Sequence, residues 1–251
     1  MAIALPVDVC PGERDRRGLT CRFRQGVVCC SRTEGQTSVK TACNDPPTTT
    51  RLIPCDHRSR NPRDGSEARH SHVIISDNHG ATWRIGGIID AEGTNESVAV
   101  ETGDGGVYLN CRDEARRGRR IVARSLDGGL TFGPAAADDA LPEPTCQASA
   151  VSFPGIDVNR QVDGDALGDV VLFANPASGT RDTLTIRLSV DGARNWVASR
   201  VIEPGPAAYC DLAVTGGGSI LCMYETGSLR PYDRLVLARF DLGWVTSRDH
   251  E

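Results

Sequence analysis

The sequence predicts an all-β protein, an antiparallel β-propeller built from four-stranded blades. A turn motif of the pattern Ser-x-Asp-x-Gly-x-Thr-Trp occurs three times, at residues 76–83, 125–132 and 189–196. The copies lie roughly 50 to 65 residues apart, which is near the length of one propeller blade. Short strand patterns fill the intervals, and the 27 glycines and 14 prolines supply turns where helical patterns are scarce.

Each position of the repeated turn has a physical role. The Asp, replaced by Asn78 in the first copy, can hydrogen-bond the nearby backbone and start a tight turn. Gly80 and Gly129 allow a positive φ that other residues resist. The Thr and the final aromatic residue favour the strand that follows and anchor the turn against the sheet. We therefore expect these turns to be structural parts of the blades.

From residue 51 onward the hydrophobic pattern indicates strands in a regular order. We expect them at residues 52–55, 72–76, 83–89, 98–100, 107–109, 121–124, 148–153, 170–173, 184–188, 213–214, 220–224 and 235–240. The polar segment 58–69 is expected to be irregular, and residues 135–141 are expected to form one helical turn. Residues 1–48 do not share the pattern, apart from a short strand expected at 27–28. The chain thus divides into a divergent segment with the composition of a disordered region (1–48) and a propeller domain (49–251).

Composition excludes several classes of function. The net charge is −5, and no basic stripe with interleaved aromatic residues is present, so no nucleic-acid partner is expected. No apolar run approaches the ~20 residues of a membrane span. The first nine residues lack the charged and apolar regions of a secretory signal, which leaves the cellular compartment unassigned.

The ten cysteines show neither a CxxC pair nor a zinc-type Cys/His spacing. Buried free thiols are favoured over a disulfide framework, because the chain is larger than the small secreted domains that depend on disulfides. The histidines at positions 57, 70, 72 and 79 are irregularly spaced and have no carboxylates arranged around them. Neither a metal site nor a cofactor is predicted.

Five further segments occur between and after the repeated turns. They are NESVAVE (95–101) with YLNCR (108–112), PTCQAS (144–149), NPAS (175–178) with Arg181 and LTIR (184–187), AYCDL (208–212) and MYE (223–225). In this order, together with turns similar to the Asp box, they resemble the sialidase (neuraminidase) family over about residues 50 to 245. The resemblance implies a ring of six blades, of which the matching residues would build about four.

The resemblance also implies an activity, that of an exo-α-sialidase acting on sialylated glycoproteins, glycolipids or oligosaccharides with retention of configuration. It implies that Tyr209 is the nucleophile and Glu96 its general base. It also implies that Arg112 and Arg181 bind the substrate carboxylate, that Gln147 bonds the sugar and that Glu225 orients an arginine.

The chemistry of the substrate accounts for these residue types. Arginine binds a carboxylate through two parallel hydrogen bonds and stays charged at any working pH. A neutral tyrosine avoids the repulsion that an anionic nucleophile would meet from the substrate carboxylate, and sialidases depart in this way from the usual pair of carboxylates. Tyrosine has an ordinary pKa near ~10 and therefore needs a base such as Glu96 to attack at neutral pH.

Two elements of the family pattern are not found. These are the arginine of a Phe-Arg-Ile-Pro segment, of which Phe23-Arg24 is a faint echo, and the aspartate acid/base that follows it. The chain therefore looks like a sialidase without its first third. A catalytically impaired propeller that only binds acidic sugars, or that serves as a scaffold, is the alternative function. A third option is an Asp-box protein of another kind, since the turn itself is structural. Structural roles also stay open for the individual residues: a surface ion pair for Arg112, packing for Tyr209 and a solvated turn for Glu96.

Overall fold

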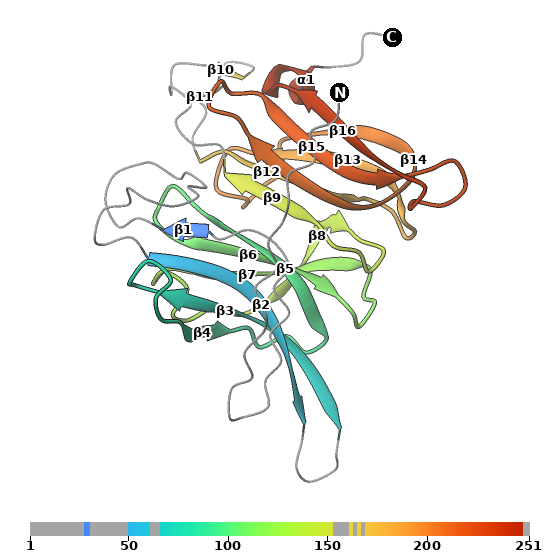
Figure 1. The fold of residues 1–251 in the computed structure, drawn as a ribbon. Helices are drawn as coiled ribbons and strands as arrows, with labels where there is room; N and C mark the ends of the chain where they lie inside the picture. The colour runs from blue at the N-terminus through green and yellow to red at the C-terminus, as the bar shows by residue number, and fades with distance from the viewer. Residues whose placement is uncertain are drawn as a thin grey trace.

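The computed structural model describes residues 28–30, 50–60, 66–152, 161–162, 165–166 and 169–247. Strands dominate these residues (Figure 1). They are β1 (Val28–Cys30), β2 (Thr50–Arg60), β3 (Glu67–Ser76), β4 (Arg84–Ile88), β5 (Thr94–Glu101), β6 (Val107–Asp113), β7 (Arg119–Ser125), β8 (Ala136–Pro142), β9 (Ser149–Ser152), β10 (Gln161–Val162), β11 (Asp165–Ala166), β12 (Val171–Pro176), β13 (Asp182–Ser189), β14 (Ala198–Val214), β15 (Ile220–Thr226) and β16 (Arg234–Phe240). One short helix, α1 (Leu242–Thr246), follows them.

The strands form consecutive antiparallel blades. Strands β1-β2-β3-β4 make the first sheet and β5-β6-β7-β8 the second. The six-stranded sheet β16-β15-β14-β13-β12-β9 contains two more blades, because the 17-residue strand β14 changes partner along its length. Residues 198–206 of β14 pair with β13, and residues 207–214 pair with β15. The third blade is therefore β9, β12, β13 and the first part of β14, and the fourth is the second part of β14 with β15 and β16. The predicted all-β propeller of about four blades is confirmed.

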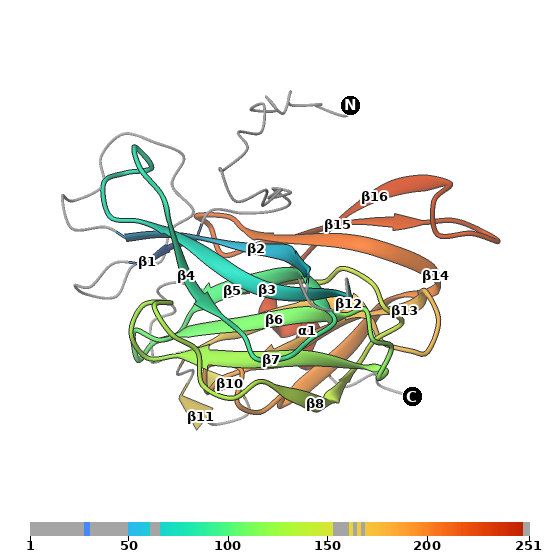
Figure 2. The ribbon, with the colours of Figure 1, turned by 90° about the horizontal axis from the view of Figure 1, so that it is seen from below.

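Strands of successive blades lie side by side. β5 contacts β2 on one side and β9 on the other, and β9 also contacts β14. Figure 2 shows the strands of the first two blades, blue to green, beside the orange strands of the last two. Segments that are distant in sequence therefore meet where these strands converge.

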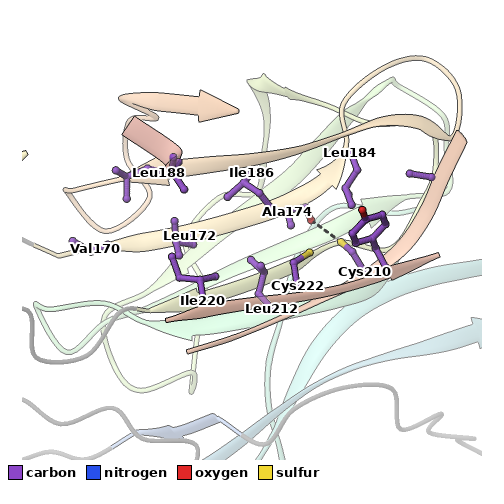
Figure 3. Packing of buried hydrophobic residues seen from close by; sticks show 13 residues of the cluster. Val170, Leu172, Ala174, Leu184, Ile186, Leu188, Cys210, Leu212, Ile220 and Cys222 are labelled. Atoms are coloured by element: carbon purple, nitrogen blue, oxygen red, sulfur yellow. Dashed lines mark hydrogen bonds between the residues drawn. The ribbon is translucent and has the colours of Figure 1, made fainter. Parts of the chain in front are cut away.

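The core lies between the blades. Val171 and Phe173 of β12 pack toward the second blade, with Tyr108 among their neighbours. Leu172, which alternates with them, packs toward the fourth blade, in one cluster with Leu212 of β14. Figure 3 shows this second cluster, including the bond from the Cys210 thiol to the Ala174 carbonyl at 3.3 Å. Both faces of β12 are thus buried, which accounts for the apolar run over residues 171–174.

The three Asp boxes share one hydrogen-bond pattern. In each, the Ser hydroxyl donates to the carboxylate or amide oxygen two residues later, at 3.0 Å in the first box, 2.7 Å in the second and 2.8 Å in the third. The same hydroxyl accepts a bond from the backbone nitrogen four residues later at 2.8 Å in all three. Gly80 and Gly129 have φ of 89° and 88°, which confirms the prediction for these two positions. In the third box Ala193 takes this role at φ 61° without being glycine.

Every strand predicted between residues 52 and 240 overlaps an observed strand, but two local predictions were wrong. Residues 136–142 form β8 rather than a helical turn, pairing with β7 from Val122↔Ala136 to Arg119↔Pro142. This stretch is an outer strand, so ladder hydrogen bonds outweigh the weak strand preference of its Ala and Asp residues. The segment 58–69 is regular at both of its ends, because the β2–β3 ladder continues to Arg60↔Glu67, while residues 61–65 lie outside the described part of the chain.

The structure tests few of the predictions for the N-terminal segment. Within residues 1–48 the structure describes only 28–30, which pair with β2, so the expected strand at 27–28 is met at residue 28 and residue 27 lies outside the described part. The division at residue 48 stays a prediction. No helix within the described ranges is long and apolar enough to cross a membrane.

Four cysteines are buried free thiols, Cys111, Cys146, Cys210 and Cys222, and Cys55 is buried as well. Burial raises the pKa of Cys146 to about 11 and that of Cys222 to about 12. Such thiols stay protonated and act as small packing residues.

Candidate active site

Two β-bulges carry the central side chains. In the β5–β6 pair the register shifts between Asn95 and Ser97, which leaves Glu96 as the extra residue. In the β14–β15 pair it shifts between Ala207 and Cys210, the interval that contains Tyr209. A bulge redirects a side chain out of the alternating pattern of the strand. Both side chains consequently point toward a common space between the second and fourth blades.

Glu96, Arg112 and Tyr209 meet there, although up to 113 positions separate them in the chain. The Tyr209 hydroxyl donates to the Glu96 carboxylate, 2.8 Å from Oε1 and 2.9 Å from Oε2. Arg112 Nη1 lies 2.6 Å from Glu96 Oε2 and 3.4 Å from the Tyr209 oxygen. The side chains of Arg112 and Glu96 are each 16% exposed, so the ion pair is partly shielded from water.

The charges of this cluster keep Tyr209 protonated. Burial raises the pKa of Tyr209, the hydrogen bond to Glu96 and its negative charge raise it further, and Arg112 opposes them. Burial alone would lower the pKa of Arg112, but the Glu96 carboxylate outweighs it and the net direction is upward. The resting cluster is therefore a neutral phenol held by a carboxylate and a permanent cation.

Arg181 completes the group. Its guanidinium carbon lies 5.7 Å from the centre of the Tyr209 ring. Nη1 donates to the Tyr232 hydroxyl at 2.7 Å and Nη2 donates to the Thr145 carbonyl at 3.1 Å. Burial lowers the pKa of Arg181, while Cys146 and the two tyrosines raise it, and the net direction is upward. The guanidinium groups of Arg112 and Arg181 thus both lie beside the Tyr209 phenol.

Gln147 and Glu225 contact the backbone around Tyr209. The buried Gln147 amide donates to the Cys210 carbonyl at 2.9 Å and accepts from the Cys210 nitrogen at 3.0 Å. Glu225 Oε2 accepts from the backbone nitrogen of Tyr209 at 3.1 Å. The roles expected from sequence, a bond from Gln147 to the sugar and the orienting of an arginine by Glu225, stay predictions.

Sequence patterns do not single out Asp56. It lies in β2, paired with Ser71, whose hydroxyl donates to the Asn95 carbonyl at 2.9 Å just before Glu96. Burial raises the pKa of Asp56, Arg69 lowers it, and the Glu96 charge raises it, with a net upward direction. Asp56 was not predicted as a site residue because the hairpin that contains it continues into a stretch that looks irregular in sequence.

Three histidines of the same hairpin lie close together. His57 Nδ1 lies 3.1 Å from His72 Nδ1, and the rings of His57 and His70 stack with centroids 6.0 Å apart. Burial and the neighbouring His57 lower the pKa of His72 to about 4, so it is neutral near pH 7. Among the residues that the structure describes, no group of three His, Cys, Asp or Glu side chains is placed to hold a metal ion.

Comparison with known proteins decides the family. The model of the BNR repeat-like domain matches residues 33–222. The chain belongs to the sialidase family. It is 41% identical to a sialidase of Micromonospora viridifaciens, over 68% of this chain and 25% of that protein, and 28% identical to human sialidase-4, over 69% of this chain and 54% of that protein. Among solved structures, the Hadza microbial sialidase Hz136 superimposes with a TM-score of 0.64 and 26% identity, over 78% of this chain and 36% of the other.

The chain covers only part of the length of these relatives. It spans between a quarter and about half of the length of the two curated proteins just named. An intramolecular trans-sialidase from Ruminococcus gnavus, 18% identical with a TM-score of 0.60, shares the fold.

Proposed function

We propose that this chain is an exo-α-sialidase that hydrolyses terminal sialic acids with retention of configuration, with Tyr209 as nucleophile and Glu96 as its base. The observation that carries the proposal is the placement of the Tyr209 hydroxyl within 2.9 Å of both Glu96 oxygens. A base within hydrogen-bond reach of a hydroxyl is the arrangement that activates a weak nucleophile.

The arginines supply the recognition of an anion. Arg112 and Arg181 approach Tyr209 from its hydroxyl and from its ring face, so a carboxylate held by both would lie beside the phenol. Arg112 Nε is buried and makes no hydrogen bond within the described part of the chain, which leaves donor capacity on that guanidinium. The substrate class that fits is a sialylated glycoprotein, glycolipid or oligosaccharide.

The charges of the site determine the order of the proton transfers. Because Glu96 raises the pKa of Tyr209, the phenol keeps its proton until the oxygen attacks the anomeric carbon. Glu96 accepts that proton as the new C–O bond forms and the bond to the aglycone breaks, and the aglycone oxygen takes up a proton from an acid. In the second step water displaces Tyr209 from the sugar and gives one proton to the base left by that acid, while Glu96 returns its proton to the phenolate. Two displacements at one carbon restore its configuration.

A second candidate function is binding of acidic sugars without turnover. The sequence favours it on one point, because neither the third arginine nor the aspartate acid of the family pattern is found in the chain. Binding requires only Arg112 and Arg181, whereas turnover of a natural substrate also requires an acid for the aglycone.

Paired substrates separate the two functions. An aryl sialoside has a leaving group that departs without a proton, and an alkyl sialoside does not. Release of sialic acid from both substrates, abolished in Tyr209→Phe, supports the hydrolase. Release from the aryl substrate alone means that the acid for the aglycone is what the chain lacks. Binding of free sialic acid that is lost in Arg112→Ala, with no release from either substrate, would replace the hydrolase by the binding function.

A further inference from the structure

A buried ion pair lies between the second and third blades. Arg120 of β7 and Glu143, which follows β8, approach to 3.0 Å with side chains that are 0% and 1% exposed. Arg120 also donates to the Asn110 side-chain oxygen and to the Cys146 carbonyl, both at 2.6 Å. This Arg120–Glu143 pair is remote from solvent and takes no part in the steps described above.

Each oxygen of Glu143 also accepts a backbone bond beside a residue of the site. Oε1 accepts from the nitrogen of Asp113, which follows Arg112, at 2.6 Å. Oε2 accepts from the nitrogen of Cys146, which precedes Gln147, at 3.3 Å. One carboxylate therefore fixes the end of β6 and the loop that leads to β9.

Gln147 carries this connection to the fourth blade. Its amide oxygen and nitrogen bond the nitrogen and carbonyl of Cys210 at 3.0 Å and 2.9 Å. Cys210 directly follows Tyr209, at the end of the bulge in β14. The path from Glu143 through Gln147 thus joins the backbone beside Arg112 to the backbone beside Tyr209.

Stability alone does not account for this arrangement. Apolar side chains of similar volume replace buried ion pairs with little loss of stability, or with a gain. Apolar side chains cannot accept hydrogen bonds from two backbone nitrogens on different segments, as Glu143 does. Gln147 likewise supplies one acceptor and one donor to a bulge whose own ladder is interrupted.

We propose that Glu143 and Gln147 are positioning residues of this site, which set the Tyr209 hydroxyl against Glu96 and Arg112 by bonding the backbone next to each. The inference rests on the proposed function for its kinetic consequence. It differs from the sequence expectation, in which Gln147 bonds the sugar itself.

The test uses Gln147→Met, which keeps the length of the side chain and removes both Cys210 bonds, and Glu143→Gln, which removes the charge and one acceptor. Ser189→Ala is the control, because it removes a buried hydroxyl from the third Asp box without touching the site. If Glu143→Gln does not fold, Gln147→Met still decides. The first readout is kcat and KM with an aryl sialoside. The second is the phenol titration of Tyr209, measured by ultraviolet difference against Tyr209→Phe in the same background.

A positioning role predicts that kcat falls about 10- to 100-fold in Gln147→Met while KM changes less, since a small misplacement of reacting groups is costly. It also predicts that the Tyr209 titration moves toward the ordinary value without any sugar present, because the phenol leaves Glu96. A rise in KM alone with an unchanged titration would assign Gln147 to the sugar and overturn the proposal. If the unmodified chain shows no turnover, the proposed function fails, and the titration still decides the positioning.

Discussion

Replacing Glu96 by glutamine tests the central contact of the site with little change of shape. The substitution removes a negative charge that contacts both Tyr209 and Arg112. Glutamine keeps one acceptor oxygen and presents an N–H₂ group in place of the other. One of the two donors that now face Glu96 therefore loses its partner.

The expected losses of folding stability and of catalytic rate in Glu96→Gln differ in size. A hydrogen bond to a charged group contributes about 1.5–3 kcal/mol. Since Glu96 and Arg112 are mostly shielded, at 16% exposure each, we expect Glu96→Gln to lower the free energy of unfolding by about 2 kcal/mol. Loss of a general base costs about 10²- to 10⁴-fold in rate, which is about 3–5 kcal/mol of barrier. Catalysis should therefore lose more than the fold does.

The assay combines urea denaturation, steady-state kinetics and the ultraviolet titration of Tyr209. Because the Glu96 charge raises the pKa of Tyr209, that pKa should fall in Glu96→Gln. The control is Glu67→Gln, which breaks an exposed ion pair with Arg58 at 3.4 Å and should change stability by less than about 1 kcal/mol. A Tyr209 titration that does not move, or a kcat that falls no further than in the control, would refute the assignment of Glu96 as base.

Three other perturbations have defined outcomes. Phe173 is fully buried, so Phe173→Ala should lower the free energy of unfolding by about 3–5 kcal/mol, measured by denaturant titration. Hydrogen bonds from Thr131 lower the pKa of Asp127 to about 2, so the stability this carboxylate contributes is complete above its unfolded pKa near ~4 and is lost as pH falls toward 2. Asp127→Asn should accordingly lose less stability than the unmodified chain between these two pH values, and an equal loss would count against the box as the cause. Tyr232→Phe removes a hydroxyl 2.7 Å from Arg181 Nη1 and should weaken binding of free sialic acid about 2- to 10-fold by calorimetry, whereas unchanged binding would mean that Arg181 needs no such support.

The repeated turns and most strands were predictable because their causes are local. Ser125, Asp127 and Gly129 bond one another within five residues, so the pattern of one copy is sufficient to describe its turn. The apolar run of β12 likewise identifies a strand buried on both faces. The choice of Glu96, Arg112 and Tyr209 as candidates came from the resemblance of their segments, and the structure brings all three together.

The remaining features depend on contacts that the local sequence does not indicate. Nothing near Glu143 in sequence indicates that its oxygens bond the nitrogens of Asp113 and Cys146, 30 residues and 3 residues away. Strand β8 was mistaken for a helical turn since its partner strand, not its own residue preferences, determines its conformation. The two halves of β14 are also unrecognisable in sequence, because the change of partner occurs within one continuous strand.

The third blade separates the two parts of the candidate site. Glu96 and Arg112 belong to the second blade and Tyr209 to the fourth, so the blade between them sets their separation. β12 fills that space with side chains packed in alternate directions, Phe173 toward the second blade and Leu172 toward the fourth. Interiors packed at this density transmit a change of volume to their neighbours. Substitutions in β12 should therefore alter the Tyr209–Glu96 contact without touching either residue, whereas equally destabilising changes in an exposed outer strand such as β4 should not.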